Sequence, residues 1–261
     1  LGIISRIVRA IGPREGDRLV EIGPGQGALT APLLEATGKL EVIELDRDLI
    51  PGLRVQFFNY PEFVIHEGDA LKFDFAELKG DGPALRVVGN LPYNISTPLI
   101  VHLLSMGSAI ADMHFMLQKE VVERLAAEPG STDWGRLSVM AQYYCQVDHL
   151  FIVPPEAFVP RPKVDSAIVR LTPHEHLPHT ADDPTLLFEL VKLAFGQRRK
   201  TLRNNLKGRV SADTLEALGI DPARRPQTLT VAEYVAIANQ VAADEAASAV
   251  ANGDTKGSDE A

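Results

Sequence analysis

The stretch Arg18-Leu-Val-Glu-Ile22-Gly23-Pro-Gly-Gln-Gly27-Ala28 joins a short apolar run to closely spaced glycines. An apolar run of this length between turn signals predicts a buried strand. Glycines directly after a strand let the backbone turn sharply and approach a ligand without a Cβ in the way. The stretch therefore predicts a strand, a ligand-binding turn and the start of a helix.

Similar strand-like runs recur along the chain, with helical sequence between them. We predict strands at 18–22, 40–44, 63–66, 85–89, 112–117, 149–153 and 166–171. We predict helices at 2–11, 27–36, 47–56, 97–106, 118–127 and 135–146. This alternation indicates βαβ units, hence an α/β fold with a Rossmann-like, mainly parallel sheet. The last two strands flank the proline-rich loop 154–163 and predict an antiparallel hairpin at the sheet edge.

After Pro173 the pattern becomes helical, with predicted helices at 185–195, 198–208, 211–218 and 230–241. We expect a catalytic domain over 1–176, a small all-α domain over 177–241 and a disordered acidic tail over 242–261. Acidic, Ala/Ser/Gly-rich sequence is typical of disorder. The three histidines of the segment 174–179 could suggest a metal site, but we interpret this segment as a linker without a fixed scaffold and expect no metal.

Composition limits the classes of protein. The chain has 261 residues, 45% of them apolar, which suits one large and one smaller domain. It lacks the ~20-residue apolar run needed to span a bilayer, so we expect no membrane partner. A single cysteine, Cys145, favours a buried thiol over a disulfide framework, and hence a reducing cytoplasm. We also expect a monomer.

Candidate cofactor-binding residues stand at successive predicted strand ends. Gly23, Gly25 and Ala28 satisfy the pattern of a dinucleotide site, so NAD remains a competitor. Glu21 favours S-adenosylmethionine, because a carboxylate beside the turn would repel a pyrophosphate and suits a cationic ammonium and sulfonium. Glu44 is placed to accept the ribose hydroxyl hydrogens. The remaining candidates are Leu45, Asp69, Ala70 and Asn90.

The tetrapeptide Asn90-Leu91-Pro92-Tyr93 follows the predicted strand 85–89 and is the candidate catalytic motif. Pro92 fixes its own φ and pushes Leu91 toward extended geometry. The carbonyl groups of Asn90 and Leu91 can then accept hydrogen bonds from an exocyclic amine. Tyr93 supplies a ring that can stack on a base, worth about 1–3 kcal/mol.

Longer runs of sequence make a family resemblance specific. The runs 88–98, 112–121 and 135–139 resemble the ribosomal RNA adenine dimethyltransferases, and within them the bacterial small-subunit enzymes. The runs 155–166 and 195–202 continue the resemblance, which covers roughly residues 3–241. It implies S-adenosylmethionine-dependent dimethylation of N6 of two adjacent adenosines near the 3′ end of 16S rRNA, within the small (30S) ribosomal subunit.

A flipped adenine can stack between two side chains. Tyr93 would cover one face, and we expect Phe158, between Pro155 and Pro160, to cover the other.

The net charge of the chain is −9, yet one run is basic without any acid. The candidate RNA-binding residues are Arg161, Lys163, Arg198, Arg199, Lys200, Arg203 and Lys207. Phosphate contacts by such residues dominate affinity for a polyanion.

Several alternatives stay open. Family members carry a basic amino-terminal segment before the first helix, and we expect this chain to be a fragment without it and weakly active. A 23S rRNA methyltransferase would share the catalytic domain, although the run 112–145 argues against it. A protein glutamine methyltransferase would carry Pro in place of Leu91 and would not need the basic run. A non-catalytic ribosome-assembly role can coexist with the enzyme activity.

Overall fold

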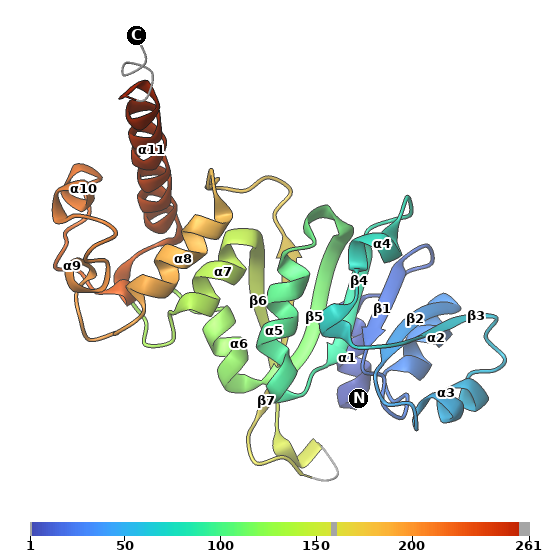
Figure 1. Ribbon diagram of the computed structural model, residues 1–261. Helices are drawn as coiled ribbons and strands as arrows, with labels where there is room; N and C mark the ends of the chain where they lie inside the picture. The colour runs from blue at the N-terminus through green and yellow to red at the C-terminus, as the bar shows by residue number, and fades with distance from the viewer. Residues whose placement is uncertain (1, 158–160, 256–261) are drawn as a thin grey trace. The chain divides into compact units, whose positions relative to one another are not determined.

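The computed structural model describes residues 2–157 and 161–255, and its main feature is a seven-stranded sheet (Figure 1). The strands are β1 (Arg18–Ile22), β2 (Lys39–Glu44), β3 (Glu62–Glu67), β4 (Leu85–Asn90), β5 (Ile110–Gln118), β6 (Cys145–Val153) and β7 (Ser166–Pro173). Their order is β3-β2-β1-β4-β5-β7-β6. β7 pairs antiparallel with β5 and β6, and the other pairs are parallel. The predicted Rossmann-like sheet and its antiparallel edge hairpin are confirmed.

The strand order reverses between β1 and β4, which are neighbours in the sheet but not in sequence. Connections from these two strands lead to opposite sides. A crevice therefore opens outside their carboxyl ends, which is where ligands bind in open α/β sheets.

Helices cover both faces of this sheet. They are α1 (Ile3–Ile11), α2 (Thr30–Thr37), α3 (Ile50–Gln56), α4 (Phe75–Lys79), α5 (Tyr93–Leu104) and α6 (Lys119–Leu125), with single turns η1 (Ala70–Lys72), η2 (Gly107–Ala109) and η3 (Pro155–Ala157). α1, α2 and α3 share one core cluster with the sheet, and α5 and α6 lie on the other face (Figure 1).

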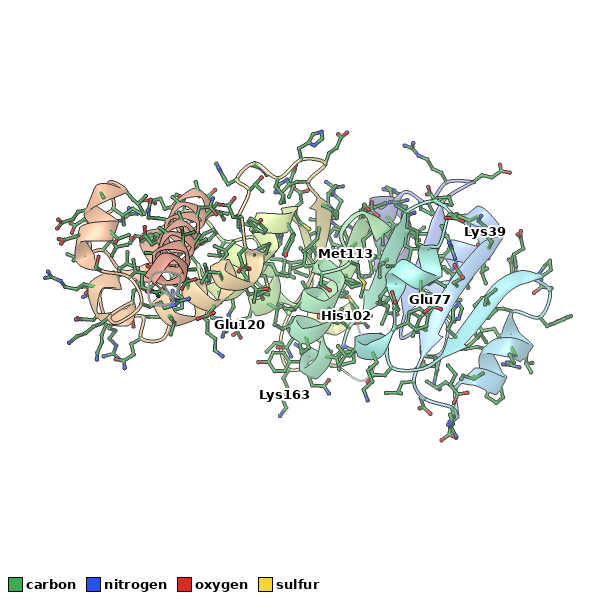
Figure 2. All side chains as sticks on the ribbon, turned by 45° about the horizontal axis from the view of Figure 1, so that its top comes forward. Lys39, Glu77, His102, Met113, Glu120 and Lys163 are labelled. Atoms are coloured by element: carbon green, nitrogen blue, oxygen red, sulfur yellow. The ribbon has the colours of Figure 1, made fainter. Side chains whose placement is uncertain are left out.

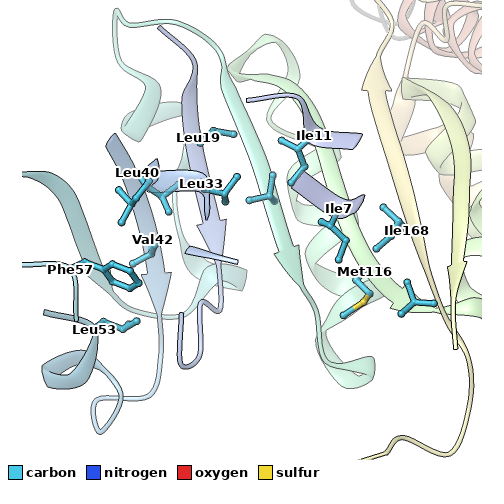
Figure 3. Close-up of a cluster of buried hydrophobic side chains, with 13 residues drawn as sticks. Ile7, Ile11, Leu19, Leu33, Leu40, Val42, Leu53, Phe57, Met116 and Ile168 are labelled. Carbon is cyan, nitrogen blue, oxygen red and sulfur yellow. The ribbon is translucent and has the colours of Figure 1, made fainter. Parts of the chain in front are cut away.

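Helix α1 forms one wall of the crevice. Its Ile7 and Ile11, one turn apart, both belong to the core cluster, and Ile7 lies beside Met116 of β5 and Ile168 of β7 (Figure 3). Burying one such aliphatic side chain stabilises the fold by about 1.5–3 kcal/mol. Arg86 of β4 holds the end of the helix, because its guanidinium donates to the Ile11 carbonyl at 2.5 Å. Sequence and packing together thus fix α1 over the sheet.

A second compact unit contains residues 127–143 and 176–261. Its helices are α7 (Arg136–Tyr144), α8 (Pro184–Ala194), α9 (Leu202–Asn205), α10 (Ala212–Ala217) and α11 (Val231–Thr255), with the turn η4 (Pro226–Thr228). The division at Glu175 and His176 falls within the predicted connector. Residues 127–143, which we had placed in the first domain, belong to the second because buried Trp134 donates its indole N–H to the Leu229 carbonyl at 2.9 Å.

Three predictions of local structure are wrong. Residues 242–255 are helical within α11, since alanine favours a helix even in an acidic segment. The predicted helix 198–208 is confined to Leu202–Asn205, because the Thr201 hydroxyl caps a new helix start. Cys145 begins β6 instead of ending a helix, and it is buried.

No described helix is both long and apolar enough to cross a membrane.

Candidate active site

A cavity of about 460 Å³ lies at the carboxyl ends of β1 and β4. Its walls come from the glycine turn, from α1, from the end of β4 and from β5. The residues that line it are Ile3, Ile4, Ile7, Glu21, Gly23, Pro24, Gly25, Gln26, Ala28, Leu29, Gly89, Asn90, His114, Phe115, Met116, Ala157 and Ile168. A concave, mostly apolar site with a few polar groups is typical of a small-molecule site.

The glycine turn bends over the end of β1. Gly23, Gly25 and Gly27 all have positive φ, at 65°, 59° and 89°. A Cβ on Gly27 would lie 2.9 Å from the Phe57 ring, so glycine also permits close packing there. The Gly23 N–H donates to the Ile43 carbonyl at 2.9 Å, which fixes the turn against β2. The predicted strand and the turn after it are confirmed, whereas the helix begins at Thr30 and not at the predicted residue 27.

Glu21 lies at the base of the cavity and is only 2% exposed. The Thr30 hydroxyl donates to its carboxylate at 2.5 Å. Burial raises the pKa of Glu21 from 4.5 to about 7, while the Thr30 hydrogen bond lowers the pKa and nearby Glu44 raises it. A cationic ligand would relieve this burial cost, so the position suits an ammonium or sulfonium group.

Glu44 ends β2 beside the turn. Its carboxylate accepts the Gly25 N–H at 3.3 Å and the Asp46 N–H at 3.2 Å. Each carboxylate oxygen keeps a second lone pair, which can accept a hydroxyl hydrogen. Leu45, which follows, is 65% exposed and offers an apolar surface next to that carboxylate. The pair suits a ribose and the ring attached to it.

Asp69 lies after β3 and caps the short turn η1. Its carboxylate accepts the Leu71 N–H at 2.9 Å, and Ala70 begins the turn. This cap holds the side chain at the carboxyl edge of the sheet. A role toward an adenine amino group stays a prediction for Asp69 and Ala70.

The first residue of the predicted catalytic tetrapeptide reaches the cavity. Asn90 ends β4 and lines the cavity. Leu91 is buried, and its N–H donates to the Met116 carbonyl at 3.1 Å. Pro92 is the residue before α5, and Tyr93 is the first residue of that helix, 61% exposed. The helix thus begins earlier than the predicted 97, and its first side chain is exposed.

The proposed second stacking residue, Phe158, lies outside the described residues. Arg161, nearby in sequence, forms an ion pair with Glu156 at 2.5 Å. Lys163 lines a separate hollow of about 400 Å³, which it shares with Glu120 (Figure 2). These two cations therefore lie among acids, which weakens them as isolated phosphate contacts.

The basic run 198–207 divides into two kinds of residue. Arg198 is structural, because its guanidinium donates to the Trp134 carbonyl at 2.8 Å and the Thr132 carbonyl at 2.9 Å. The other four cations are exposed, and none of them forms an ion pair with a described residue. They are Arg199, Lys200, Arg203 and Lys207.

Sequence reasoning missed two buried polar residues of the site. Thr30 is fully buried and orients Glu21. His114 is 3% exposed and lines the cavity. A histidine within the apolar run Met113–Leu117 was the available signal, because buried strands rarely carry an unpaired polar side chain.

Comparison with known proteins places this geometry in context. The family model "Ribosomal RNA adenine dimethylase" matches residues 2–243. "Ribosomal RNA small subunit methyltransferase A" of Chromohalobacter salexigens is 71% identical over 245 residues, covering 92% of this chain and 87% of that protein. The protein of the same name from Pseudomonas aeruginosa is 63% identical over 241 residues, covering 92% and 90%.

Solved structures show the same fold. A dimethyladenosine transferase from Plasmodium falciparum has a TM-score of 0.76 and 28% identity, covering 90% of this chain and 93% of that chain. The 23S rRNA methyltransferase ErmE has a TM-score of 0.71 and 22% identity, covering 92% and 96%. At that lower identity the second likeness speaks for the fold alone.

Proposed function

The chain belongs to the ribosomal RNA adenine dimethylase family, and we propose that the cavity between β1 and β4 is where it holds its cofactor and target base. It is an S-adenosylmethionine-dependent rRNA methyltransferase that dimethylates N6 of two adjacent adenosines near the 3′ end of 16S rRNA, a step in small-subunit biogenesis. Membership of this family excludes the NAD dehydrogenase that the glycine pattern alone left open.

The residues present fit the cofactor. A buried carboxylate, Glu21, faces a cavity whose other walls are mainly apolar, and it suits the cationic methionine end. Glu44 and Leu45 would hold the ribose and one face of the adenine, with Asp69 and Ala70 at the adenine amino group. Gly23 and Gly25 leave room for the chain that joins these parts. When bound, S-adenosylmethionine supplies a methyl group on a cationic sulfur, with a neutral thioether as leaving group.

The observation that supports this proposal is that Asn90, the first residue of the tetrapeptide, lines the same cavity as Glu21. The Asn90 side-chain oxygen and the Leu91 carbonyl would accept the N6 hydrogens and steer the nitrogen lone pair toward the methyl group. Tyr93 would stack on one face of the flipped adenine. We expect Phe158 on the other face. Most of the rate then comes from positioning, and no strong base is needed.

The four exposed cations of the basic run support rRNA binding by the second unit. Such contacts fix orientation on a polyanion without reading its sequence. We propose weaker contributions from Arg161 and Lys163, and a structural one from Arg198. A ribosomal substrate also implies work in the cytoplasm, and we propose that the chain acts there as a monomer without a metal ion.

Methyl transfer to small ribosomal subunits that lack the modification tests the assignment. We expect label from S-adenosylmethionine to appear as N6,N6-dimethyladenosine on nucleoside mass spectrometry. Tyr93→Ala should lower kcat/KM by about tenfold or more, because a stacked base contributes about 1–3 kcal/mol. Tyr93→Phe, which keeps the ring, is the matched control and should stay near wild type. Label on another nucleoside, or none on adenosine, would contradict the assignment.

A further inference from the structure

One buried polar side chain in the cavity wall has no role in the transfer described above. His114 lies in β5, is 3% exposed, and lines the cavity beside Ile7, Met116 and Ile168. Neither of its ring nitrogens has a hydrogen-bond partner among the described residues. Burying a polar atom without a partner costs free energy. A ligand group that pairs with this imidazole would remove that cost.

Strand register places His114 in the same row of the sheet as Glu21. Glu21 of β1 is opposite Val88 of β4, and Val88 is opposite His114 of β5. Adjacent strands are about 4.8 Å apart, so the two backbones are separated by about 10 Å. Residues opposite each other share a face, here the face on which Ile7 packs against Met116 (Figure 3). The two side chains therefore approach the cavity from its two sides.

The charged groups around His114 already have partners. Arg86 pairs with Asp17 at 2.7 Å and with Asp112 at 3.0 Å. Arg170 pairs with Asp148 at 3.3 Å. Burial lowers the pKa of His114 from 6.5 to about 4; Asp112 opposes this shift, and both arginines add to it. The imidazole is thus neutral at neutral pH, with one N–H donor and one lone pair to offer.

The methionine half of the cofactor matches these two walls. It carries a cationic ammonium and an anionic carboxylate on the same carbon atom. Glu21 attracts the ammonium and repels the carboxylate, which therefore turns away from β1. A carboxylate only accepts hydrogen bonds, and the apolar side chains Ile7, Met116 and Ile168 have none to donate. The His114 N–H is a donor on that side of the cavity.

We propose that His114 is a cofactor-binding residue whose imidazole N–H donates a hydrogen bond to the α-carboxylate of S-adenosylmethionine. The inference rests on the proposed function and deepens it, because it gives the amino-acid end of the cofactor two anchors. Glu21 holds the ammonium and His114 holds the carboxylate. With both charged groups on the α-carbon fixed, the sulfonium methyl keeps a constant direction toward Asn90.

Calorimetric titration with two related ligands tests the proposal. S-adenosylmethionine carries the carboxylate, whereas decarboxylated S-adenosylmethionine keeps the ammonium and the sulfonium without it. We expect wild type to prefer the first by about tenfold or more, as for a hydrogen bond to a charged group. His114→Leu should reduce this preference toward one. His114→Gln, which keeps an N–H donor, should restore part of it.

His102 provides a matched control in the same unit (Figure 2). It is bonded to the Phe73 carbonyl at 2.7 Å and does not line the cavity. His102→Leu should leave the preference unchanged. An unchanged preference in His114→Leu, or equal weakening of both ligands, overturns the proposal. Failure of wild type to bind either ligand would instead contradict the proposed function.

A measurement on wild type covers the case in which His114→Leu does not fold. The imidazole N–H signal of ¹⁵N-histidine-labelled protein, assigned by comparison with His114→Gln, should shift when S-adenosylmethionine is added. Decarboxylated S-adenosylmethionine should leave that signal close to its free position. Identical shifts with both ligands would overturn the proposal.

Discussion

Glu21 is the residue whose environment departs furthest from that of an ordinary carboxylate. It is 2% exposed, and its one described side-chain hydrogen bond comes from Thr30. Burial raises its pKa to about 7, so the folded protein binds a proton there that the unfolded chain releases near pH 4.5. Stability therefore falls as pH rises between these two values, by roughly 3 kcal/mol in total.

Glu21→Gln should remove this pH dependence. The amide cannot ionise, so the variant should gain stability relative to wild type by roughly 2–3 kcal/mol between pH 5 and pH 7.5. Urea unfolding of both proteins at several pH values measures the difference. Taking the difference cancels His114, whose pKa is lowered to about 4 and whose contribution is lost as pH falls below 6.5.

Thr30→Val is the companion variant for this prediction. It removes the hydroxyl that favours the ionised carboxylate, so the decline in stability should extend to higher pH. Parallel stability curves for wild type and Glu21→Gln across this pH range would show that Glu21 titrates normally in the folded state.

Single residues of the site were predictable where a backbone rule or a distinctive charge marked them. The glycines of the turn, Glu21, Glu44 and Asn90 all carry such a mark in the sequence. Thr30 carries none, and His114 is marked only as a polar residue within an apolar run, which does not by itself distinguish a functional histidine from a structural one. Their importance depends on burial, which arises only when α1 and α2 pack on the sheet.

At the scale of elements, β4 must lie very close to β1 for the site to form. Gly89 is opposite Ile22, and a Cβ on it would lie 2.7 Å from the Ile22 carbonyl oxygen and 3.3 Å from a Leu91 methyl group. The first contact involves backbone, which cannot rotate away as a side chain can. The glycine therefore sets the spacing at the row just below Asn90.

Gly89→Ala should push the end of β4 away from β1. We expect a loss of about 1–3 kcal/mol in the free energy of unfolding, as for other overpacked interiors. Affinity for S-adenosylhomocysteine should also fall, because Asn90 moves with the strand. Urea unfolding and calorimetric titration measure the two effects.

Gly52→Ala provides the control. Gly52 lies within α3, and a Cβ there would meet nothing within 4 Å. This variant should keep its ligand affinity, and its free energy of unfolding should rise by roughly 0.5–1 kcal/mol, because alanine has a higher helix propensity than glycine. Equal stability of the two alanine variants would show that Gly89 is not a close-contact position.

Elements with strong periodicity were predicted well, and those with competing signals were not. β1 and β2 match their predictions to within one residue. The run ending at Cys145 is mostly apolar, which does not show where a helix ends; helix α7 stops at Tyr144, and pairing with Pro173 of β7 makes Cys145 strand. The acidic end of α11 was predicted to be disordered from its composition, but its alanines have high helix propensity and it is helical.

At the scale of the whole molecule, positive and negative charges are unevenly distributed along the chain. The chain carries a net charge of −9, yet Arg199, Lys200, Arg203 and Lys207 are exposed and form no ion pair with described residues. Binding to a polyanion depends on such a local group and not on the overall sum.

Reversing two of these charges should weaken rRNA binding. For Arg199→Glu with Arg203→Glu, we expect lower affinity for unmethylated small subunits and a slope of log affinity against log salt reduced by about 2. Filter binding at several salt concentrations measures both quantities. Arg198 is unsuitable for this test, because its loss would also disturb the Trp134 segment.

A double variant of equal net charge in the first unit serves as control. Arg54→Glu with Lys72→Glu changes two exposed cations outside the basic run. If both double variants weaken binding to the same degree, the effect is one of total charge, and the basic run is not the rRNA contact.

The sequence by itself determined the fold class, the succession of strands and turns along the chain, and the tetrapeptide at the end of β4. These features depend on local rules: apolar periodicity, backbone freedom at glycine and restriction at proline. Only the tertiary structure decided that Glu21 and His114 share one row, that Thr30 orients Glu21, and that Arg198 is structural. Such relations depend on which distant segments pack together, and burial then sets the pKa and the hydrogen-bonding need of each group.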